Sequence, residues 1–449
     1  MKKILVLGAG QSSSFLIDYL LKLADKHNWF VTVADRDVEL ARRRVNKHPR
    51  GLGIAFEVND VEFRATQIEK ADLVVNMLPP NFQYLIAIDC LYHAKPMLSA
   101  SYQDAKIKSL DRDAHRKGVL ILSEMGVDPG IDHMLAMSMI HKVQERGGSI
   151  TSFKSYGGGL PAPDSLVNPL KYFVTWNPRN VVMSGEHGAQ YLENGKVKLV
   201  SHQNLFQHSW PVEVEGIGVL EAYPNRDSLT YRSIFEIDHA QTIIRGTLRY
   251  PGWSETWLQI VKLGIPNEHL QIPNLENTSY REFVEMFIPS DLSGADLEQR
   301  VANYLNINPT GKIMDNLRWL GLFSDERIDC HCQTAADVMI HLLKQKLALP
   351  KGARDMVVLI HELEVAYPDK SRRVRSRLVE FGESDGFTAV TRTVGLPLAI
   401  ATRLILENEL PLTGCHIPTL PAIYVPVLRE LQKAGLNFTE VEGPLTPHE

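Results

Sequence analysis

Two side chains suited to acid–base chemistry, Tyr102 and Asp128, each follow a short apolar segment of this 449-residue chain. Asp128 lies between an apolar strand predicted at residues 119–122 and an amphipathic helix predicted at about residues 131–144, and Pro129 and Gly130 follow it directly. An acid in that place presents a carboxylate and free backbone N–H groups to a crevice in an α/β protein. The alternative is a plain strand-to-helix turn in which Asp128 only caps the helix.

A glycine-containing segment, Gly8-Ala9-Gly10-Gln11-Ser12-Ser13, follows a strand predicted at residues 4–7 and precedes a helix predicted at about residues 14–26. The spacing matches the fingerprint G-x-G-x-x-G, with Ser13 in the third place, where a small side chain still permits close helix–strand packing. The first two glycines allow a tight turn and a close approach of the backbone to a pyrophosphate. The segment therefore predicts a dinucleotide site, and the alternative is a turn of the same type that binds no dinucleotide.

Asp35 and Arg36 stand side by side at the end of the next predicted strand, residues 30–34. An acid at this place suits the ribose hydroxyls of NAD, whereas an arginine suits the 2′-phosphate of NADP. The sequence is therefore compatible with NAD or NADP, and the position of Asp35 at the strand end favours NAD.

Arginines in the middle of the chain are candidates for binding carboxylates. Arg226 lies in a turn-rich segment at residues 222–228, and Arg245, Thr247 and Arg249 share one face of a strand predicted at residues 243–250. Like charges on one face repel unless anions lie between them, which favours a carboxylate clamp built on the planar guanidinium fork. The alternative is a solvated basic edge.

The elements that must position these residues fall into two patterns. Strands alternate with helices over about the first 125 residues, which predicts a parallel sheet with right-handed crossovers and a ligand at the carboxyl ends of the strands. After residue 148 a strand of mixed polarity is predicted at residues 151–156, then an irregular Gly- and Pro-rich loop at 157–163. A mostly helical stretch covers residues 266–349, a hairpin is predicted from 355–366 and 373–381, and the apolar helix at 389–408 should pack on the N-terminal domain.

Composition narrows the class of protein. The formal net charge of −5 argues against a nucleic-acid partner. The four cysteines are too few and scattered for a disulfide framework, and Cys330-His331-Cys332 lacks the spacing of a structural zinc site, so no metal is expected. The N-terminal apolar run is too short for a signal peptide, and no apolar run approaches the roughly 20 residues of a membrane span, so a cytoplasmic protein without a membrane partner is expected.

Several longer motifs occur in a fixed order and together resemble the saccharopine dehydrogenase family of the glutamate-forming type, also called saccharopine reductases. They are Ser101-Tyr102 and the segments 127–133 (VDPGIDH), 158–163 (GGLPAP), 223–228 (YPNRDS), 245–250 (RGTLRY), 319–324 (WLGLFS), 354–357 (RDMV) and 393–402 (TVGLPLAIAT). The resemblance covers nearly the whole chain and is far more specific than the glycine fingerprint. Two departures are Ser13, where alanine or glycine is usual, and Asp35 before the arginine that NADP-using members employ.

The resemblance implies a fold and a set of contacts. The expected fold is α/β, with a Rossmann domain (residues 1–127 and 388–449), a mixed-sheet catalytic domain that also forms a homodimer (128–265 and 350–387) and a small helical domain (266–349). The positions that match the family's cofactor contacts are Gly8, Gly10, Gln11, Ser12, Ser13, Asp35, Arg36, Glu57, Val58, Met77, Leu78, Ser99 and Ala100. The positions that match its substrate contacts are Ser101, Tyr102, Asp128, Arg226, Thr247, Leu248 and Arg249.

The reaction that the resemblance implies is the NAD(P)-dependent oxidation of saccharopine, through an imine, to L-glutamate and 2-aminoadipate 6-semialdehyde, or its reverse, in lysine metabolism. Saccharopine carries three carboxylates, for which arginines are suitable partners. The amine must lose a proton before the hydride leaves, so Asp128 and Tyr102 are the candidate catalytic groups, with neither assigned as the base. His133 is expected to be a neutral packing residue. Alternatives are a relative acting on another carboxylated amine, such as carboxynorspermidine dehydrogenase, and a non-catalytic dinucleotide-binding relative.

Overall fold

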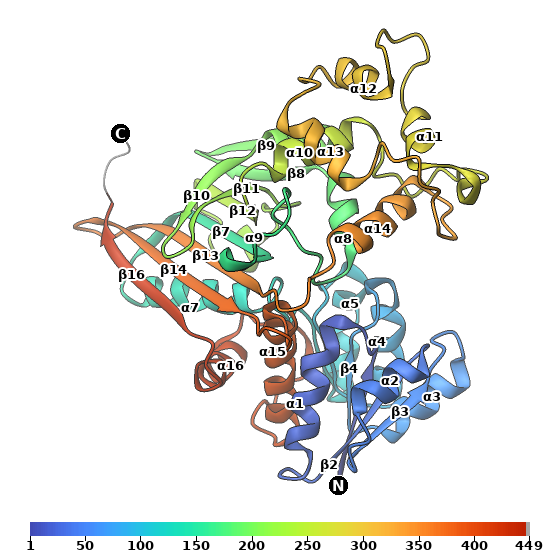
Figure 1. Ribbon diagram of the computed structural model, residues 1–449. Coiled ribbons are helices and arrows are strands. Elements are labelled where there is room, and N and C mark those ends of the chain that lie inside the picture. Colours follow the sequence, from blue (N-terminus) through green and yellow to red (C-terminus); the bar gives the residue numbers. More distant parts are fainter. Residues whose placement is uncertain (446–449) are drawn as a thin grey trace. The chain divides into compact units, whose positions relative to one another are not determined.

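The computed structural model describes residues 1–445, which form two compact units (Figure 1). Unit 1 comprises residues 1–150 together with the chain from residue 359 onward, and unit 2 comprises Thr151–Val358. The two divisions fall at the start of one strand and inside another, β7 (Ser149–Pro161) and β13 (Asp355–Ala366). The division of the chain into three domains stays a prediction.

Unit 1 is built on a parallel sheet whose strands, within the described residues, follow the order β15-β6-β5-β4-β1-β2-β3. The bounds are β1 (Lys2–Leu7), β2 (Trp29–Asp35), β3 (Gly51–Ala55), β4 (Leu73–Asn76), β5 (Met97–Ser99), β6 (Leu120–Leu122) and β15 (Gly414–His416). The chain moves outward from β1 in one direction through β2 and β3, and in the other through β4, β5 and β6. A ligand crevice is expected where the order reverses, at the carboxyl ends of β1 and β4. The predicted parallel sheet is confirmed.

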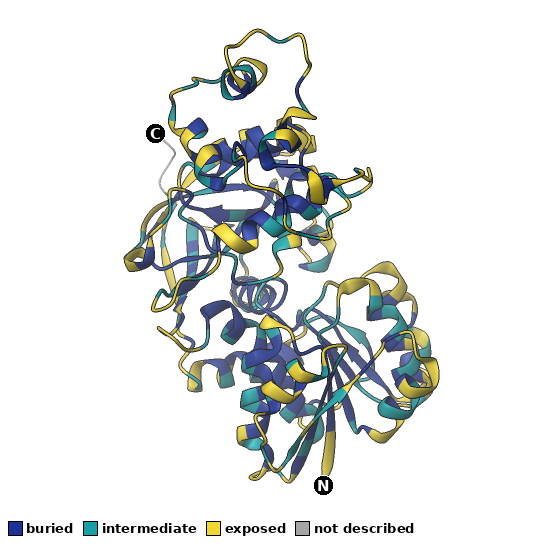
Figure 2. Ribbon diagram, turned by 45° about the vertical axis from the view of Figure 1, so that its right-hand side comes forward, coloured by how far each residue is buried: buried dark blue, intermediate teal, exposed yellow. Residues whose placement is uncertain are grey.

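Several helices of unit 1 begin at a polar residue whose side chain caps them. Asp37 and Asp104 each accept a backbone N–H of the first turn, from Leu40 (3.0 Å) and Ile107 (2.8 Å). Besides the short helices η1 (Gln11–Ser13) and η2 (Pro80–Phe82), the helices are α1 (Ser14–Ala24), α2 (Val38–Val45), α3 (Val61–Lys70), α4 (Gln83–Tyr92), α5 (Ala105–Ser109), α6 (Asp111–Lys117), α7 (Ile131–Glu145), α15 (Ala389–Leu406) and α16 (Pro421–Lys433). Their buried faces appear dark blue in Figure 2.

Helix α15 contains the long apolar segment noted in the sequence. By length and composition it could cross a membrane, contrary to the expectation that no segment would qualify, and 72 % of it is buried inside the structure. It contacts α1, where a Cβ on Gly395 would lie only 2.7 Å from the backbone nitrogen of Leu16. Such burial and close backbone packing are those of a core helix, and the expected return of this segment onto the N-terminal part of the chain is confirmed.

Unit 1 also contains most of the predicted hairpin. Strand β13 pairs with β14 (Ser371–Phe381), and β14 pairs in antiparallel fashion with β16 (Phe438–Pro444). The turn between β13 and β14 is closed by the N–H of Tyr367, which donates to the carbonyl of Lys370 at 2.8 Å. The hairpin is therefore confirmed, whereas β16 was not expected.

Unit 2 contains a mixed sheet in which β12 (Thr242–Arg249) lies antiparallel to β11 (Gly218–Pro224) and parallel to β7. Strands β8 (Ala189–Glu193), β9 (Lys196–Val200) and β10 (Trp210–Val214) extend it. The sequence prediction of an irregular loop from residue 157 was wrong for residues 157–161, which continue β7. A Cβ on Gly158 would lie 2.8 Å from the carbonyl oxygen of Leu248, so the glycines allow close strand packing rather than a loop.

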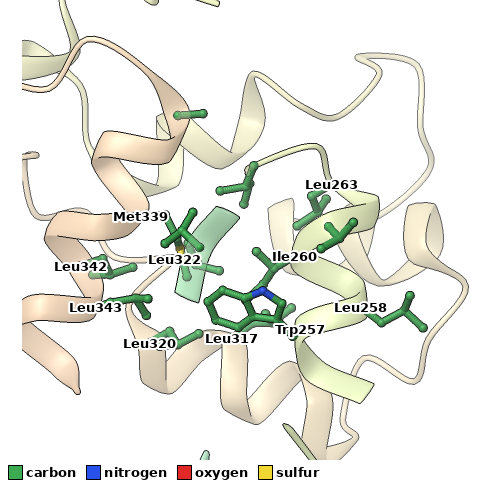
Figure 3. Close-up of a cluster of buried hydrophobic side chains, with 14 of the residues drawn as sticks. Trp257, Leu258, Ile260, Leu263, Leu317, Leu320, Leu322, Met339, Leu342 and Leu343 are labelled. Carbon is green, nitrogen blue, oxygen red and sulfur yellow. The ribbon is translucent and has the colours of Figure 1, made fainter. Parts of the chain in front are cut away.

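The helices of unit 2 pack around a cluster of buried apolar side chains (Figure 3). Trp257 on α10 (Trp253–Lys262) lies among Leu317 and Leu320 of α13 (Lys312–Leu320) and Met339 and Leu342 of α14 (Ala335–Lys346). The remaining helices are α8 (Pro178–Val182), α9 (Tyr231–Ile234), α11 (Tyr280–Glu285) and α12 (Leu297–Leu305), with short turns η3 (Pro163–Ser165), η4 (Met183–Gly185), η5 (His202–Gln207) and η6 (Leu275–Asn277). Capping boxes at Ser279 and Thr334 start α11 and α14.

Candidate functional site

The glycine turn at the end of β1 has the geometry of a dinucleotide fingerprint. Gly8 has a φ of 100°, and a Cβ there would lie 3.0 Å from the carbonyl oxygen of Met77 at the end of β4. A Cβ on Gly10 would meet nothing within 4 Å, which leaves space for a ligand. Ser13 is buried and donates its hydroxyl to the carbonyl of Gly10 at 3.0 Å, so a small serine fits the third position as expected.

The carboxylate of Asp35 accepts hydrogen bonds from the backbone around this turn. One carboxylate oxygen accepts the N–H of Ala9 at 2.6 Å, and the other accepts the N–H of Asp37 at 2.9 Å. Both oxygens therefore hold the glycine turn and the start of α2, which limits their capacity to bind ribose hydroxyls. The preference for NAD that was predicted from Asp35 is therefore not supported.

Arg44 contacts the glycine turn and was not among the cofactor residues predicted from the sequence. Its guanidinium donates from Nε to the carbonyl of Ala9 (3.1 Å) and from Nη2 to that of Gly10 (3.4 Å). Burial, and secondarily the neighbouring Arg43, lower the pKa of Arg44. The exposed Arg36 belongs to the same end of β2. The sequence does show a run of three arginines, Arg42–Arg44, at the end of the helix that follows Asp35. Only the fold shows that Arg44 is the one that contacts the glycine turn.

The other predicted cofactor positions follow strands of the same sheet. Glu57 and Val58 come after β3, Met77 and Leu78 after β4, and Ser99 ends β5, with Ala100 next to it. Because β3, β2, β1, β4 and β5 are consecutive in the sheet, their carboxyl ends form one edge. These positions are thereby placed on the edge that carries the glycine turn.

Tyr102 and Asp128 meet at this edge of unit 1. The phenol of Tyr102 donates to Oδ1 of Asp128 at 3.1 Å, and Tyr102 is 37 % exposed. The N-cap residue of α7 is Gly130, two positions after Asp128, and Asp128 accepts the phenol of Tyr102, so the alternative in which Asp128 merely caps the helix is wrong. Ser101 is tied to the same region, since its N–H donates to the hydroxyl of Ser99 (3.0 Å). An acid and a phenol in contact form a pair able to hold or move a proton.

The turn that carries Asp128 is held by close backbone contacts. The N–H of Gly126 donates to the carbonyl of Pro129, and the N–H of Ile131 donates back to the carbonyl of Gly126, both at 3.0 Å. The Asp128–Pro129 peptide bond is cis. Gly130 has a φ of 147°, and a Cβ there would overlap the backbone of Gly126. Only glycine fits at position 130, so the turn has a single compact geometry.

Beneath this turn lies a buried cluster of charges. Nε2 of His133 lies 2.8 Å from a carboxylate oxygen of Glu124, and Nδ1 lies 2.9 Å from a carboxylate oxygen of Asp132. Burial by itself would lower the pKa of His133, but Asp132 and Glu124 outweigh it and raise the pKa to about 9. The expected burial of His133 is confirmed, whereas the expected neutral ring was wrong, because two carboxylates face it.

In unit 2, Arg249 is enclosed by aromatic rings. Its guanidinium carbon lies 4.8 Å from the ring centre of Tyr172, 5.6 Å from that of Trp253 and 5.7 Å from that of Tyr223. The residue is 3 % exposed, and Nη1 donates to the carbonyl of Leu248 at 2.8 Å. Burial raises the pKa of Tyr223 despite the opposing charge of Arg249. Among residues 1–445 no carboxylate lies within 4.0 Å of this cation, and the alternative of a solvated basic edge is wrong.

The other predicted substrate residues of unit 2 lie in strand β12 or in the loop next to it. Arg245 is 5 % exposed and lies over the ring of Tyr231 at 4.3 Å. Thr247 pairs with Tyr223 across β11 and β12, while Leu248 turns its side chain into the core. Arg226 is exposed in the loop after β11, next to Asn225, whose N–H donates to the carbonyl of Arg245 at 2.8 Å. Strand β12 therefore carries Arg245, Thr247 and Arg249, and the loop that contains Arg226 lies beside this strand.

The cysteines differ from expectation in one respect. Cys330 and Cys332 form a disulfide, a pairing that the sequence argument against a disulfide framework did not include. The same two residues line a surface pocket of about 410 Å³ with His331, Gln333, Asp337, Ile340, His341 and Lys344. Both sulfurs are engaged with each other, so neither is offered as a metal ligand.

The sheet order, the glycine turn at its switch point and the acid–phenol pair define a dinucleotide-dependent oxidoreductase of the Rossmann class. The chain belongs to the saccharopine dehydrogenase family. Residues 4–122 match the saccharopine dehydrogenase NADP binding domain, and residues 126–436 match the saccharopine dehydrogenase C-terminal domain. The family resemblance inferred from the sequence is therefore confirmed.

Full-length relatives support the same assignment. The chain is 31% identical over 448 residues to saccharopine dehydrogenase [NADP(+), L-glutamate-forming] of Schizosaccharomyces pombe, covering 98% of this chain and 99% of that protein. It is 33% identical to the mitochondrial alpha-aminoadipic semialdehyde synthase of Bos taurus, of whose length it spans 47%. The solved structure of apo saccharopine dehydrogenase (L-Glu forming) from Saccharomyces cerevisiae has a TM-score of 0.86 at 29% identity, with 99% and 100% of the two chains covered.

Proposed function

We propose that the protein is an NADP-dependent saccharopine dehydrogenase that forms L-glutamate. The names of its full-length relatives support this substrate. The observation that carries the proposal is Arg249, a buried cation that has no carboxylate partner among the described residues. Burying an unpaired charge is costly, so a bound carboxylate is the natural counterion. Saccharopine offers three carboxylates, and Arg245 and Arg226 provide further positive charge.

The preference for NADP over NAD rests on the contacts of Asp35 and on the arginines near it. Both oxygens of Asp35 already accept backbone N–H groups, whereas Arg36 is exposed at the strand end. Arg44 adds a second guanidinium at the glycine turn. Guanidinium groups bind phosphates strongly, so these two residues would hold the 2′-phosphate of NADP. Gly10 leaves the space that the pyrophosphate needs.

The proposed reaction removes a hydride from the carbon that bears the secondary amine of saccharopine. The bound dinucleotide supplies the hydride acceptor. The amine is first deprotonated, the C–H pair of electrons leaves as hydride, and the resulting imine takes up water and splits into glutamate and 2-aminoadipate 6-semialdehyde. Asp128, paired with Tyr102, would hold or accept the amine proton, and its contact with the phenol would pass that proton outward.

The test is the formation of reduced dinucleotide, followed by absorbance, with saccharopine and separately with carboxynorspermidine. Turnover with saccharopine and a higher kcat/KM with NADP than with NAD are expected. Turnover with carboxynorspermidine alone would reassign the substrate, and no turnover with either would leave a dinucleotide-binding protein without this activity. We also propose a cytoplasmic homodimer, on the ground of the family resemblance; light scattering coupled to gel filtration measures the oligomeric state.

A further inference from the structure

His133 lies where two loops of unit 1 come together, and the reaction outlined above assigns it no role. The ring is completely buried on the first turn of α7 and has a carboxylate at each of its two nitrogens. Each of these two carboxylates also accepts a backbone N–H group from a loop, so the ring is connected to both loops and does more than fill space.

The two carboxylates lead to different loops. Glu124 accepts the N–H of Gln103 at 2.9 Å, and the N–H of Glu124 donates to the carbonyl of Ser101 at 3.0 Å, which ties Glu124 to the segment on either side of Tyr102. Asp132 accepts the N–H of Gly130 at 2.7 Å, and its own N–H donates to the carbonyl of Val127 at 3.0 Å. Asp132 is thereby tied to the turn on either side of Asp128.

The same two loops are also joined by the hydrogen bond from the phenol of Tyr102 to Oδ1 of Asp128, at 3.1 Å. The segments 101–103 and 127–130 are therefore linked twice, once by this hydrogen bond and once by the buried ring. The positions of Glu124 and Asp132 fix the backbone of each loop, and the ring fixes the separation of these two acids.

Only the protonated ring can join both acids. A neutral imidazole has one N–H donor, so it would leave one of the two carboxylates facing a lone pair, whereas the imidazolium donates from both nitrogens. A buried carboxylate facing a lone pair is strongly destabilised and would push the loops apart. The raised pKa of His133 agrees with this geometry.

We propose that His133 is a positioning residue whose imidazolium, held between Glu124 and Asp132, sets the distance between Tyr102 and Asp128. It touches no reacting atom and acts only through the two loops. This inference rests on the proposed function, because the pair that it positions is the one assigned to the amine proton.

The test compares His133→Gln with His141→Gln, a matched control two turns further along α7. His141 is half-buried and contacts the hydroxyl of Tyr424 at 2.7 Å, and no carboxylate of the described residues lies within 4.0 Å of it. Displacement of a catalytic pair by a fraction of an ångström to 1 Å lowers turnover by about 10- to 100-fold. We expect that loss in kcat for His133→Gln, with the KM for NADP changed by less than about twofold, and no loss for His141→Gln.

A double variant separates positioning from folding. His133→Gln combined with Glu124→Gln removes one of the two buried carboxylates and restores the net charge that the cluster has with the imidazolium, so the melting temperature should rise above that of His133→Gln while kcat stays low. A folded His133→Gln protein, or a folded double variant, with kcat close to that of the unmodified protein would overturn the proposal. An equal loss of dinucleotide affinity would also overturn it, because it would indicate general loosening of unit 1.

Hydrogen exchange gives a readout that does not depend on activity. The N–H groups of Gln103 and Gly130 donate to the two acids, so peptides covering residues 101–104 and 126–131 should exchange faster in His133→Gln than in His141→Gln. Unchanged exchange in both peptides would refute the proposal. If the unmodified protein fails to oxidise saccharopine, the proposed function fails, while this exchange result still decides the role of His133.

Discussion

Raising the pH should remove a stabilising charge from the interior of unit 1. The pKa of His133 is raised to about 9 in the folded protein, from the ordinary value of 6.5. The folded state therefore binds this proton more tightly than the unfolded state does, so the contribution is fully present below pH 6.5 and is lost as the pH rises through about 9. At about 1.4 kcal/mol per pKa unit, the contribution amounts to about 3 kcal/mol.

Thermal unfolding measures this contribution. For a unit of this size, each kcal/mol changes the melting temperature by about 2–4 °C, so a loss of roughly 6–12 °C between about pH 6.5 and pH 10 is expected from His133 alone. In His133→Gln the melting temperature above neutral pH should lack this decline, because no imidazolium remains to be deprotonated. His141→Gln should follow the unmodified protein, which would show that replacing a histidine of α7 does not by itself remove the decline, and the decline that remains in His133→Gln measures the titration of lysines and tyrosines.

The refuting result is a pair of parallel curves. If the unmodified protein and His133→Gln lose the same number of degrees over the alkaline range, His133 does not carry the charge assigned to it. A decline in the unmodified protein centred below pH 7 would equally refute the reasoning, since it would correspond to a ring with an ordinary pKa.

Three substitutions test the site. Arg249→Met should lower kcat/KM for saccharopine by about two to three orders of magnitude, as expected for the loss of a buried charge-assisted pair, with dinucleotide affinity unchanged; equal losses in both would refute the clamp. Arg36→Ala should raise the KM for NADP by about 10- to 100-fold with little change for NAD, and a larger loss with NAD would show that this arginine does not bind the 2′-phosphate. Asp128→Asn should lower kcat by about 10²- to 10⁴-fold if Asp128 transfers the proton, whereas a fall of about tenfold or less would leave it a binding role.

Local patterns predicted most of the fold. The strand–glycine–helix segment at residues 4–26 and the turn at Tyr367 follow from apolar periodicity and turn chemistry, and the structure confirms both. The run Gly157–Gly159 was misread because glycine allows a loop and a tightly packed strand equally well. Only the neighbouring strand, which supplies Leu248, decides between the two.

The contacts of the site depended on partners that are distant in sequence. The sequence predicted that Asp35 lies at the end of a strand. It could not show that this carboxylate accepts the N–H of Ala9, 26 residues away, instead of being available to a ribose. Glu124 and His133 are nine positions apart, yet only the turn through Gly130 brings their charges together. The roles assigned to Arg226, Thr247 and the cofactor positions stay predictions until the substitutions are made.

The discontinuity of unit 1 has a consequence for how the chain acquires its structure during synthesis. Residues 1–150 emerge first but lack α15 and β15, which come from the last quarter of the chain and complete the layer on α1 and the edge of the sheet beside β6. Unit 2 is continuous and has its own apolar core, so it can fold before synthesis ends. Until α15 arrives, the face of α1 that contacts it is uncovered, and nascent chains that stop short of residue 389 would expose that surface to chaperones and to aggregation.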